Sequence, residues 1–374
     1  MPESNSAPDL KALAQSIADG EAILVLGPEA IPLYRSRAAN AETEPSETTF
    51  GQLARQRIQE TTDIQIAYHY ERDNLFLFRD KNSKHQAQKV VKRCAADKNW
   101  LPDAELMRQI AAIKFPVVLS LSPDGYVRDA FSQYSVPYQF DYFTAKDKTA
   151  DIKLDTPKPD FPILYNLCGY ALEDDYDSVI LDYHDLFEVL KSLLGDLNVP
   201  DLLRGKLKKA NRFVLLGFRL DRWYLQLLLH YINKLEGEFD NSNHNFAMLA
   251  EVQDDARSFV IEQFQIKCIA PSRVDFDALF EACREAGALR NLPDALSGDA
   301  AQIRLLVERN ELLAALDLLE KNAANADDST AVALFKSQYN AWQKVNAAKI
   351  EDPRDLQLQL NQIRYRILTF ASKE

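Results

Sequence analysis

The sequence predicts an α/β protein with a doubly wound, mostly parallel sheet, followed by a small all-α helical bundle. Short apolar runs of strand type recur along the chain as far as Ala270 and alternate with longer segments of helical periodicity. That alternation is typical of a parallel sheet with helices on both faces. No strand-type run follows Pro293, so we expect the rest of the chain to be helical.

The expected strands are short continuous apolar runs, the pattern of strands that are buried on both faces. They lie at 22–27, 116–121, 162–167, 178–181, 212–217, 246–251 and 267–270. The first helix is expected to begin after Asp9, which caps it, and to end at Gly20. Further helices are expected near 50–60, 84–97, 103–113, 124–132, 182–194, 201–210, 221–235, 255–263 and 275–286.

The stretch 291–299, which contains Pro, Gly and Ser, marks the predicted boundary between two domains. We expect a large α/β domain at 1–290 and a small helical domain at 297–374. Four helices are expected in the small domain, near 299–309, 311–322, 330–347 and 354–371. The last two carry apolar stripes at helical spacing, which we interpret as an intramolecular core. The stripes are Val332, Phe335, Tyr339 and Trp342, and Leu356, Leu360, Ile363, Ile367 and Phe370.

Charge and cysteine content exclude several classes of protein. The 374 residues include 44 Lys and Arg against 56 Asp and Glu, a formal net charge of −12 that disfavours binding to nucleic acid or anionic lipid. No apolar run approaches the ~18 residues of a membrane helix, and the N-terminus lacks the pattern of a secretory signal. The four cysteines form no C-x-x-C pair, so we expect no disulfide framework, no zinc site and a cytoplasmic protein.

In doubly wound sheets, ligands bind beyond the carboxyl ends of the strands, so the residues after each apolar run are the candidates for a site. Gly27, Pro28 and Glu29 follow the first run. A phosphate-binding turn needs free backbone N–H groups, but Pro28 has none and Glu29 brings a negative charge. Ser122 and Asp124 follow the second run, where either can cap the next helix.

Two further turns complete the candidate site. Asn166, Cys168 and Gly169 follow the third run, and strand alternation places Asn166 and Cys168 on one face. Gly217 ends the run at 212–217, and Asp221 can begin the helix that follows. The candidate cofactor-binding residues are therefore Gly27, Pro28, Glu29, Asn166, Gly169, Gly217 and Asp221.

The order of these turns resembles the sirtuin-like family, in its bacterial branch without a zinc ribbon. A strand ending in a Gly turn, a strand followed by a motif ending in Asp124, and a strand followed by Cys168-Gly169 occur in the family's order, and LLGFRLDRW (215–223) resembles a later motif. The resemblance covers most of 10–285 and implies a fold that binds NAD. Active members of the family cleave the bond between nicotinamide and ribose. NAD is thus the candidate cofactor, although the residues themselves establish none.

The chain departs from that family at the positions that carry its chemistry. The segment Gly27–Glu29 stands where the family has a Gly-Ala-Gly turn over the NAD phosphates. Ser122 stands where the family has the Asn that orients water, Cys168 stands where it has the catalytic His, and Asp124 is kept. Cys168 accepts a proton only as a thiolate, and no cation neighbours it in the sequence. Because losing a general base costs ~10²–10⁴ in rate, we interpret Ser122, Asp124 and Cys168 as a degenerate catalytic set.

The C-terminal part, about 297–374, resembles the small helical effector-associated domains of bacterial conflict systems. The matching segments are IRLLVERNELLAALDLLE at 303–320, FKSQYNAWQKVN at 335–346 and QLNQIRYRILTF at 359–370. Such domains are adaptors, so the resemblance implies a protein partner. Arg364 and Arg366 are the candidates for an exposed binding face, and an ordinary solvated helix face explains either arginine equally well.

We therefore predict a sirtuin-fold component of a bacterial antiphage or conflict system. Its pocket is expected to be catalytically degenerate, and the protein is expected to act as an interaction or sensing module that recruits a partner through the C-terminal domain. Self-association of the large domain is a further option. Two alternatives stay open: an NAD hydrolase with a rearranged site that uses Asp124, Asn166 or Cys168, and a binder of another nucleotide.

Other chemistries lack their motifs. Neither G-x-x-x-x-G-K-[ST] nor G-x-S-x-G occurs, which excludes P-loop nucleotide hydrolysis and an α/β-hydrolase nucleophile elbow. His184 lies beside two aspartates but lacks a third ligand at the spacing of a metal site. His69 and His230 are expected on helices, as partly buried polar groups.

Overall fold

The computed structural model describes the chain in separate stretches. These are residues 10–35, 47–143, 155–171, 179–194, 200–210, 212–219, 222–228, 246–249, 267–269, 273–292, 303, 306–307, 312–322, 326–348, 360, 362–363, 366–367 and 370–371. The chain divides into two compact units, one of residues 1–128 and 137–291 and one of residues 129–136 and 292–374. The domain bounds 1–290 and 297–374 stay a prediction.

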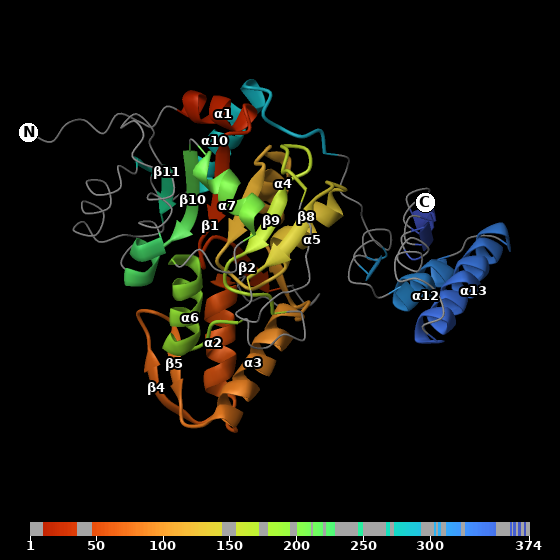
Figure 1. Ribbon diagram of the computed structural model, residues 1–374, viewed down its shortest axis with the longest axis horizontal. Coiled ribbons are helices and arrows are strands. Elements are labelled where there is room, and N and C mark those ends of the chain that lie inside the picture. The colour runs from red at the N-terminus through yellow and green to blue at the C-terminus, as the bar shows by residue number, and fades with distance from the viewer. Residues whose placement is uncertain are drawn as a thin grey trace, which may run out of the picture. The chain divides into compact units, whose positions relative to one another are not determined.

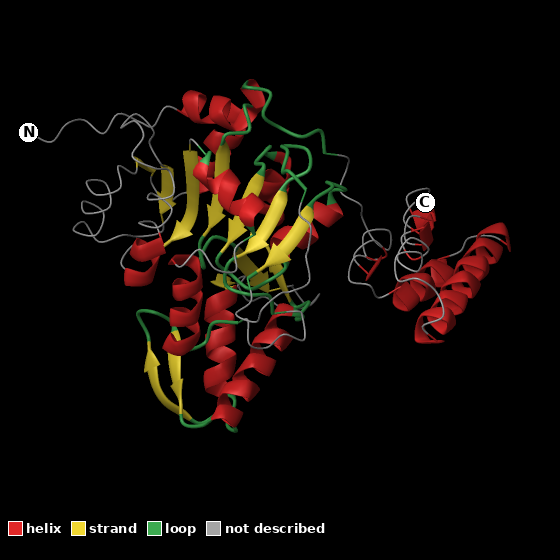
Figure 2. Ribbon diagram, in the orientation of Figure 1, coloured by secondary structure: helices red, strands yellow, loops and turns green. Residues whose placement is uncertain are grey.

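A seven-stranded parallel sheet lies at the centre of the larger unit. Its strand order is β12-β11-β10-β1-β7-β9-β8, and every neighbouring pair is parallel (Figures 1 and 2). The strands are β1 (Ala22–Leu26), β7 (Val117–Ser120), β8 (Gln139–Tyr142), β9 (Ile163–Asn166), β10 (Arg212–Phe218), β11 (Phe246–Leu249) and β12 (Lys267–Ile269). The chain builds outward from β1 on one side and then on the other, so the doubly wound α/β fold is confirmed.

The switch in strand order fixes where the site lies. β1 pairs with β10 on one side, in the register Leu26↔Leu216, and with β7 on the other, in the register Leu26↔Ser120. Because the order reverses at β1, the crevice of the fold is expected beyond the carboxyl ends of β1, β7 and β10. Figure 1 shows these ends pointing toward the helices α2 (Phe50–Glu60), α3 (Lys81–Ala95) and α6 (Tyr183–Leu194).

Two small antiparallel sheets accompany the central one. β3 (Glu47–Thr49), β2 (Pro32–Arg35) and β6 (Trp100–Pro102) form the first, and β4 (Ile66–Tyr70) and β5 (Leu75–Phe78) form a hairpin. None of these strands was predicted, nor was β8. Apart from β5, whose apolar run LFLF was missed, they are three to five residues long and lack the continuous apolar run that identified β7 and β9. The expectation of a helix around His69 is wrong: that residue lies in β4 and stacks on Phe76 of β5.

Further helices described in the larger unit include α1 (Leu10–Ala18), α4 (Ala104–Ala112), α7 (Asp201–Lys208) and α10 (Arg273–Glu285), whereas α5 (Tyr126–Gln133) includes residues of both units. Their ends follow local signals in the sequence. Gly20 follows α1 with a φ of 72°, and the Asp80 and Asp103 side chains cap α3 and α4 by accepting from backbone N–H groups. α1 packs against α10 at the end of the sheet away from α2 and α3 (Figure 1). Among the residues described, no helix is long and apolar enough to cross a membrane.

One hydrophobic core of the larger unit includes residues of the sheet and of helices α6 and α7. β1 is buried along its whole length, and Ile23 and Val25 on one of its faces pack with Val189 of α6 and with Leu203 and Leu207 of α7. Burying each of these aliphatic side chains contributes about 1.5–3 kcal/mol. The core therefore fixes the central strands, and with them the positions of their carboxyl-terminal turns.

The run at 178–181 is not a strand. Residue 178 lies outside the described part, and Val179–Leu181 form an irregular segment. The Leu181 carbonyl accepts a hydrogen bond of 2.8 Å from the Phe76 N–H, while the three side chains line a cavity. The expectation of a strand here is wrong, because an apolar run is satisfied equally well by the wall of a pocket.

The smaller unit contains α12 (Leu312–Asn322) and α13 (Ala326–Ala348), which pack together. Its core includes both stripes that the sequence singled out: Val332 and Tyr339 of one, and Leu360, Ile363 and Ile367 of the other, are buried. Phe335, Trp342 and Phe370 pack against that core, whereas Leu356 lies outside the described residues. The interpretation of the stripes as an intramolecular core is confirmed.

Arg290, next to the last residue of the larger unit, has a buried guanidinium group. Its Nη2 donates to the Phe115 carbonyl at 3.0 Å and its Nε donates to the Pro159 carbonyl at 2.8 Å. Its Nη1 donates to the carbonyls of Ala111, in the last turn of α4, and of Ile113, the residue after α4. The carbonyl groups of the last turn of a helix have no partner within it. Arg290 supplies these carbonyls with donors and ties the end of the α/β unit to its middle.

Candidate functional site

The turn after β1 has no backbone N–H left for a ligand. The Gly27 N–H donates to the Leu216 carbonyl at 2.7 Å, and the Glu29 N–H donates to the Gly217 carbonyl at 3.3 Å. Pro28 between them has no N–H. A phosphate cradle works by presenting free N–H groups to the anion. In this turn the carbonyl groups of β10 accept the hydrogen bonds that an anion would otherwise accept.

Two glycines allow the two turns to approach so closely. A Cβ atom on Gly27 would lie 2.2 Å from the Gly217 carbonyl oxygen. A Cβ atom on Gly217, whose φ is 70°, would lie 2.2 Å from the Cα of Ala30. The Ala30 N–H in turn donates to the Gly27 carbonyl at 3.2 Å. The role of these glycines is close backbone packing between β1 and β10.

Glu29 is neutralised by arginines from the segment after β10. Arg222 Nη2 donates to Glu29 Oε1 at 2.8 Å, and only 7% of the Arg222 side chain and 17% of the Glu29 side chain are exposed. Arg219 Nη1 lies 4.0 Å from the same oxygen. Arg222 Nη1 also donates to the Tyr224 hydroxyl at 3.2 Å. The acidic residue that the sequence placed at the phosphate position is therefore one half of a mostly buried ion pair.

A second polar group lies beyond β7 and β9, where Ser122, Asp124 and Asn166 are all buried. The Ser122 hydroxyl donates to Asp124 Oδ2 in a short hydrogen bond, and Asn166 Nδ2 donates to the Asp124 carbonyl at 2.8 Å. Asp124 Oδ1 accepts from the Tyr126 N–H at 3.1 Å and so caps α5. The structure brings these three predicted residues into one network.

Cys168 follows β9 and is only partly buried as a residue. Burial nevertheless raises the pKa of its thiol to about 12. A thiol with that pKa is protonated at neutral pH and is neither a base nor a nucleophile there. Gly169 adopts a φ of 83°, a left-handed conformation that favours glycine.

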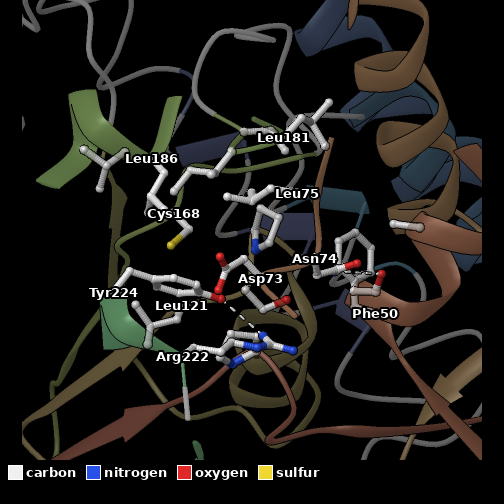
Figure 3. A pocket seen from close by; sticks show the side chains of 18 of the residues that line it. Phe50, Asp73, Asn74, Leu75, Leu121, Cys168, Leu181, Leu186, Arg222 and Tyr224 are labelled. Atoms are coloured by element: carbon white, nitrogen blue, oxygen red, sulfur yellow. Dashed lines mark hydrogen bonds between the residues drawn. The ribbon is translucent and has the colours of Figure 1, made fainter. Parts of the chain in front are cut away.

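A cavity of about 140 Å³ lies beyond these strand ends, between them and α2, the β4–β5 hairpin and α6 (Figure 3). Most of its wall is aliphatic or aromatic. The polar residues in the lining are Arg55, Asp73, Asn74, Ser122, Cys168, Arg222 and Tyr224. Burial raises the pKa of Tyr224 to about 12, so this hydroxyl is neutral as well.

The cavity gathers only part of the predicted set. Pro28, Ser122 and Cys168 line it. Gly27, Glu29, Asp124, Asn166, Gly169 and Gly217 lie in the surrounding turns and are not in the lining, and Asp221 lies outside the described residues. The strand ends thus meet as the fold predicts, but the open space begins beside them, toward α2 and α6.

Asp73 and Asn74 are the residues of the cavity that sequence analysis missed. They form the turn between β4 and β5, where Asn74 has a φ of 56° that Asn tolerates better than most residues. Tyr183 at the start of α6 donates its hydroxyl to Asp73 Oδ2 in a short hydrogen bond. The dipeptide Asp-Asn between two apolar runs is a turn signal, but nothing in the sequence indicates that this turn is buried.

Two family models match the chain. The model of the SIR2-like domain matches residues 117–269, and that of Effector-associated domain 11 matches residues 298–373. No curated protein sequence matches. The two matches occur in the same order as the resemblances inferred from the sequence and lie within their bounds, 10–285 and 297–374. Together the two domains suggest a component of a conflict or defence system. The chain carries a SIR2-like domain followed by a C-terminal effector-associated domain.

Proposed function

We propose that the protein is a component of a bacterial antiphage or conflict system whose SIR2-like domain no longer cleaves NAD and serves as an interaction or sensing module. The observation that carries this proposal is the turn after β1. Its N–H groups are bonded within the protein, and its carboxylate, Glu29, is paired with Arg222 at 2.8 Å. A pyrophosphate has neither donors nor space to bind there in the way a helix N-terminus binds phosphate.

The residue at the base position supports the same proposal. General-base catalysis needs a group that accepts a proton near neutral pH. Burial holds the pKa of the Cys168 thiol at about 12, so this side chain keeps its proton. Ser122 is engaged as a donor to Asp124 and replaces the Asn expected to orient a water.

The size of the cavity also favours binding of something smaller than a dinucleotide. Ligand pockets in proteins usually measure about 300–1,000 Å³. The cavity here measures about 140 Å³. Intact NAD would need the turns around Pro28 and Ser122 to rearrange.

We further propose that the effector-associated domain recruits a protein partner and that the full chain works in the cytoplasm, with self-association of the SIR2-like domain as an option. Of the two arginines named as candidates for the binding face, Arg366 is exposed and donates to Gln338 at 3.0 Å. Arg364 lies outside the described residues. Deleting 297–374 is expected to abolish protection against phage in cells while leaving the larger unit folded.

Incubation of the pure full-length protein with NAD, followed by measurement of nicotinamide release, tests the loss of catalysis. We expect no release above the spontaneous rate. Asp63→Ala serves as a control variant, because Asp63 is an exposed residue outside the cavity lining. Turnover that Asp124→Ala or Cys168→Ala abolishes, and that Asp63→Ala leaves intact, would overturn the proposal.

One observation favours the alternative, an NAD hydrolase with a rearranged site. Ser122, Asp124 and Asn166 form an intact buried network at the carboxyl ends of β7 and β9, where ligands of this fold bind. If this network positions a water, then Ser122→Ala and Asn166→Ala should each lower nicotinamide release without changing the circular dichroism spectrum.

A further inference from the structure

The cavity beside the SIR2-like strand ends has an apolar wall and one polar end with unused hydrogen-bonding capacity. Asp73 is 8% exposed, and its Oδ1 is buried without a hydrogen-bond partner. Asn74 Oδ1, on the next residue, is buried without a partner as well. Both residues line the cavity, and Figure 3 shows Asp73 among Cys168, Leu75 and Tyr224.

Unpaired acceptors in such a place are costly. Buried polar groups in folded proteins nearly always have a hydrogen-bond partner, and one without it bears its full desolvation penalty. Tyr183 already supplies a donor to Asp73 Oδ2, so Oδ1 is the oxygen that lacks one. A ligand that brings two or more N–H donors to this end of the cavity would relieve both Asp73 and Asn74.

The charge around Asp73 favours a cation. Within the described part of the chain, Asp73 forms no ion pair. Arg222 lines the same cavity, but its charge is taken by Glu29 at 2.8 Å. Arg55, the other cation of the lining, is partly exposed on α2 and acts on His69, whose pKa is lowered by burial and by Arg55. Asp73 is the carboxyl group of the lining without a cationic partner.

The volume of the cavity and its apolar lining define the part of the ligand that carries no charge. A cavity of about 150 Å³ lined by Leu, Ile and Phe binds benzene, and the cavity here measures about 140 Å³. Its apolar wall comes from α2, β5, α6 and the segments 179–181 and 225–228. The body that fits is a single aromatic ring or a short branched alkyl group.

We propose that this cavity is a binding site for a small organic cation, an amidinium or ammonium group on an apolar body, recognised by Asp73 and Asn74. The inference rests on the proposed loss of NAD cleavage, since it assigns the space to another ligand. On this proposal the signal that the SIR2-like domain senses is a small organic cation. Asp73 and Asn74 act as specificity-determining residues, and the aliphatic wall selects the size.

Calorimetry or ligand-observed NMR on the full-length protein tests this with four probes of matched shape. Benzamidine presents a cation with several donors, benzamide presents a neutral donor, toluene presents neither, and benzoate presents an anion. Benzamidine is expected to bind about 10- to 100-fold more tightly than benzamide, since a charge-assisted hydrogen bond is much stronger than a neutral one. Benzoate is expected not to bind. Equal binding of benzamidine, benzamide and benzoate would overturn the proposal, as would failure of benzamidine to bind.

Three variants locate the binding. Asp73→Asn keeps the shape and removes the charge, and it should weaken benzamidine binding by about 10-fold or more. Tyr183→Phe removes only the internal donor and should leave benzamidine binding unchanged or stronger. Asp63→Asn removes an exposed carboxylate outside the lining and should have no effect. Benzamidine binding that Asp73→Asn leaves intact would contradict the assignment, and if Asp73→Asn does not fold, the order of the four probes on the unaltered protein decides.

The outcome is separable from that of the NAD assay. Nicotinamide release would overturn the proposed loss of catalysis and would say nothing about benzamidine. A protein that neither binds benzamidine nor releases nicotinamide would overturn the present inference and leave the proposed function standing.

Discussion

The turn after β1 and the turn after β7 occupy equivalent places at the carboxyl edge of one sheet, yet they are stabilised differently. The first is closed by backbone contacts, with Gly27 and Gly217 so close that neither tolerates a Cβ atom. The second keeps buried side chains, Ser122 and Asp124, in a hydrogen-bonded network. The difference teaches that one edge of a sheet can have one turn filled by the main chain of its neighbour while buried polar side chains are preserved one strand away.

The largest effect is expected from Gly217→Ala. A methyl group there would lie 2.2 Å from the backbone of Ala30, at a φ of 70°, so crowding and left-handed strain add to about 3 kcal/mol or more of lost stability. Denaturant unfolding measures the loss. Gly287→Ala, with a φ of 69° and open space, should lose only about 1–2 kcal/mol. Gly205→Ala, in the interior of α7 with no neighbour, should gain about 0.5–1 kcal/mol.

Breaking the ion pair that closes the first turn should have the next largest effect. Glu29→Gln leaves the Arg222 guanidinium group buried without its carboxylate. We expect a loss of roughly 2 kcal/mol, below that of a fully buried pair because Arg219 and solvent reach the site. Glu281→Gln, which removes an exposed pair with Arg284, should cost under about 0.5 kcal/mol. Similar losses for the two variants would show that the Glu29 pair does not hold the turn.

The second turn should depend on its side chains. Ser122→Ala removes the hydroxyl group that donates to the buried Asp124 Oδ2, and we expect a loss of about 1–2 kcal/mol in thermal or denaturant unfolding. The control is Ser16→Ala, which removes an exposed hydroxyl bonded within α1 and should change stability by no more than about 0.5 kcal/mol. A neutral Ser122→Ala variant would mean that the network is not what stabilises this turn.

The smallest effect is a pH dependence from Cys168. Its pKa is raised by burial from 9.0 to about 12, so the unfolded chain loses this proton first as the pH rises. The folded protein should therefore lose stability between about pH 9 and pH 12, relative to Cys168→Ser, by roughly 1 kcal/mol at pH 10. Unfolding curves of both proteins at pH 8, 9 and 10 measure the difference. If the two proteins lose the same stability between pH 8 and pH 10, the Cys168 thiol is solvated or lies near a cation, and a catalytic role for its thiolate becomes possible again.

The sequence was sufficient to identify six of the seven strands of the main sheet, all except β8, because continuous apolar runs such as those of β1 and β10 have few alternatives to burial. The β4–β5 hairpin could not be predicted from the sequence, because the segment around His69 mixes aromatic, charged and polar residues over only a few positions. The error at 178–181 has a different cause, because an apolar run that lines a pocket looks the same in the sequence as a buried strand.

The site was predicted where it depends on the ends of strands and missed where it depends on tertiary contacts. Sequence order alone placed Pro28, Ser122 and Cys168 at one edge, and the cavity contains all three. The pairing of Glu29 with Arg222 joins residues 193 positions apart, and no periodicity reports such a contact. Asp73 comes from a hairpin turn whose burial is set by α6.

The guanidinium group of Arg290 has a practical consequence for experiments that exchange parts between related proteins. Arg290 lies two positions before the end of the described segment 273–292 and donates to four backbone carbonyls of the unit. A fragment that ends at 288 would lack all four hydrogen bonds. Chimaeras joined after Asn291 keep these hydrogen bonds and are the natural way to join this SIR2-like domain to another C-terminal domain.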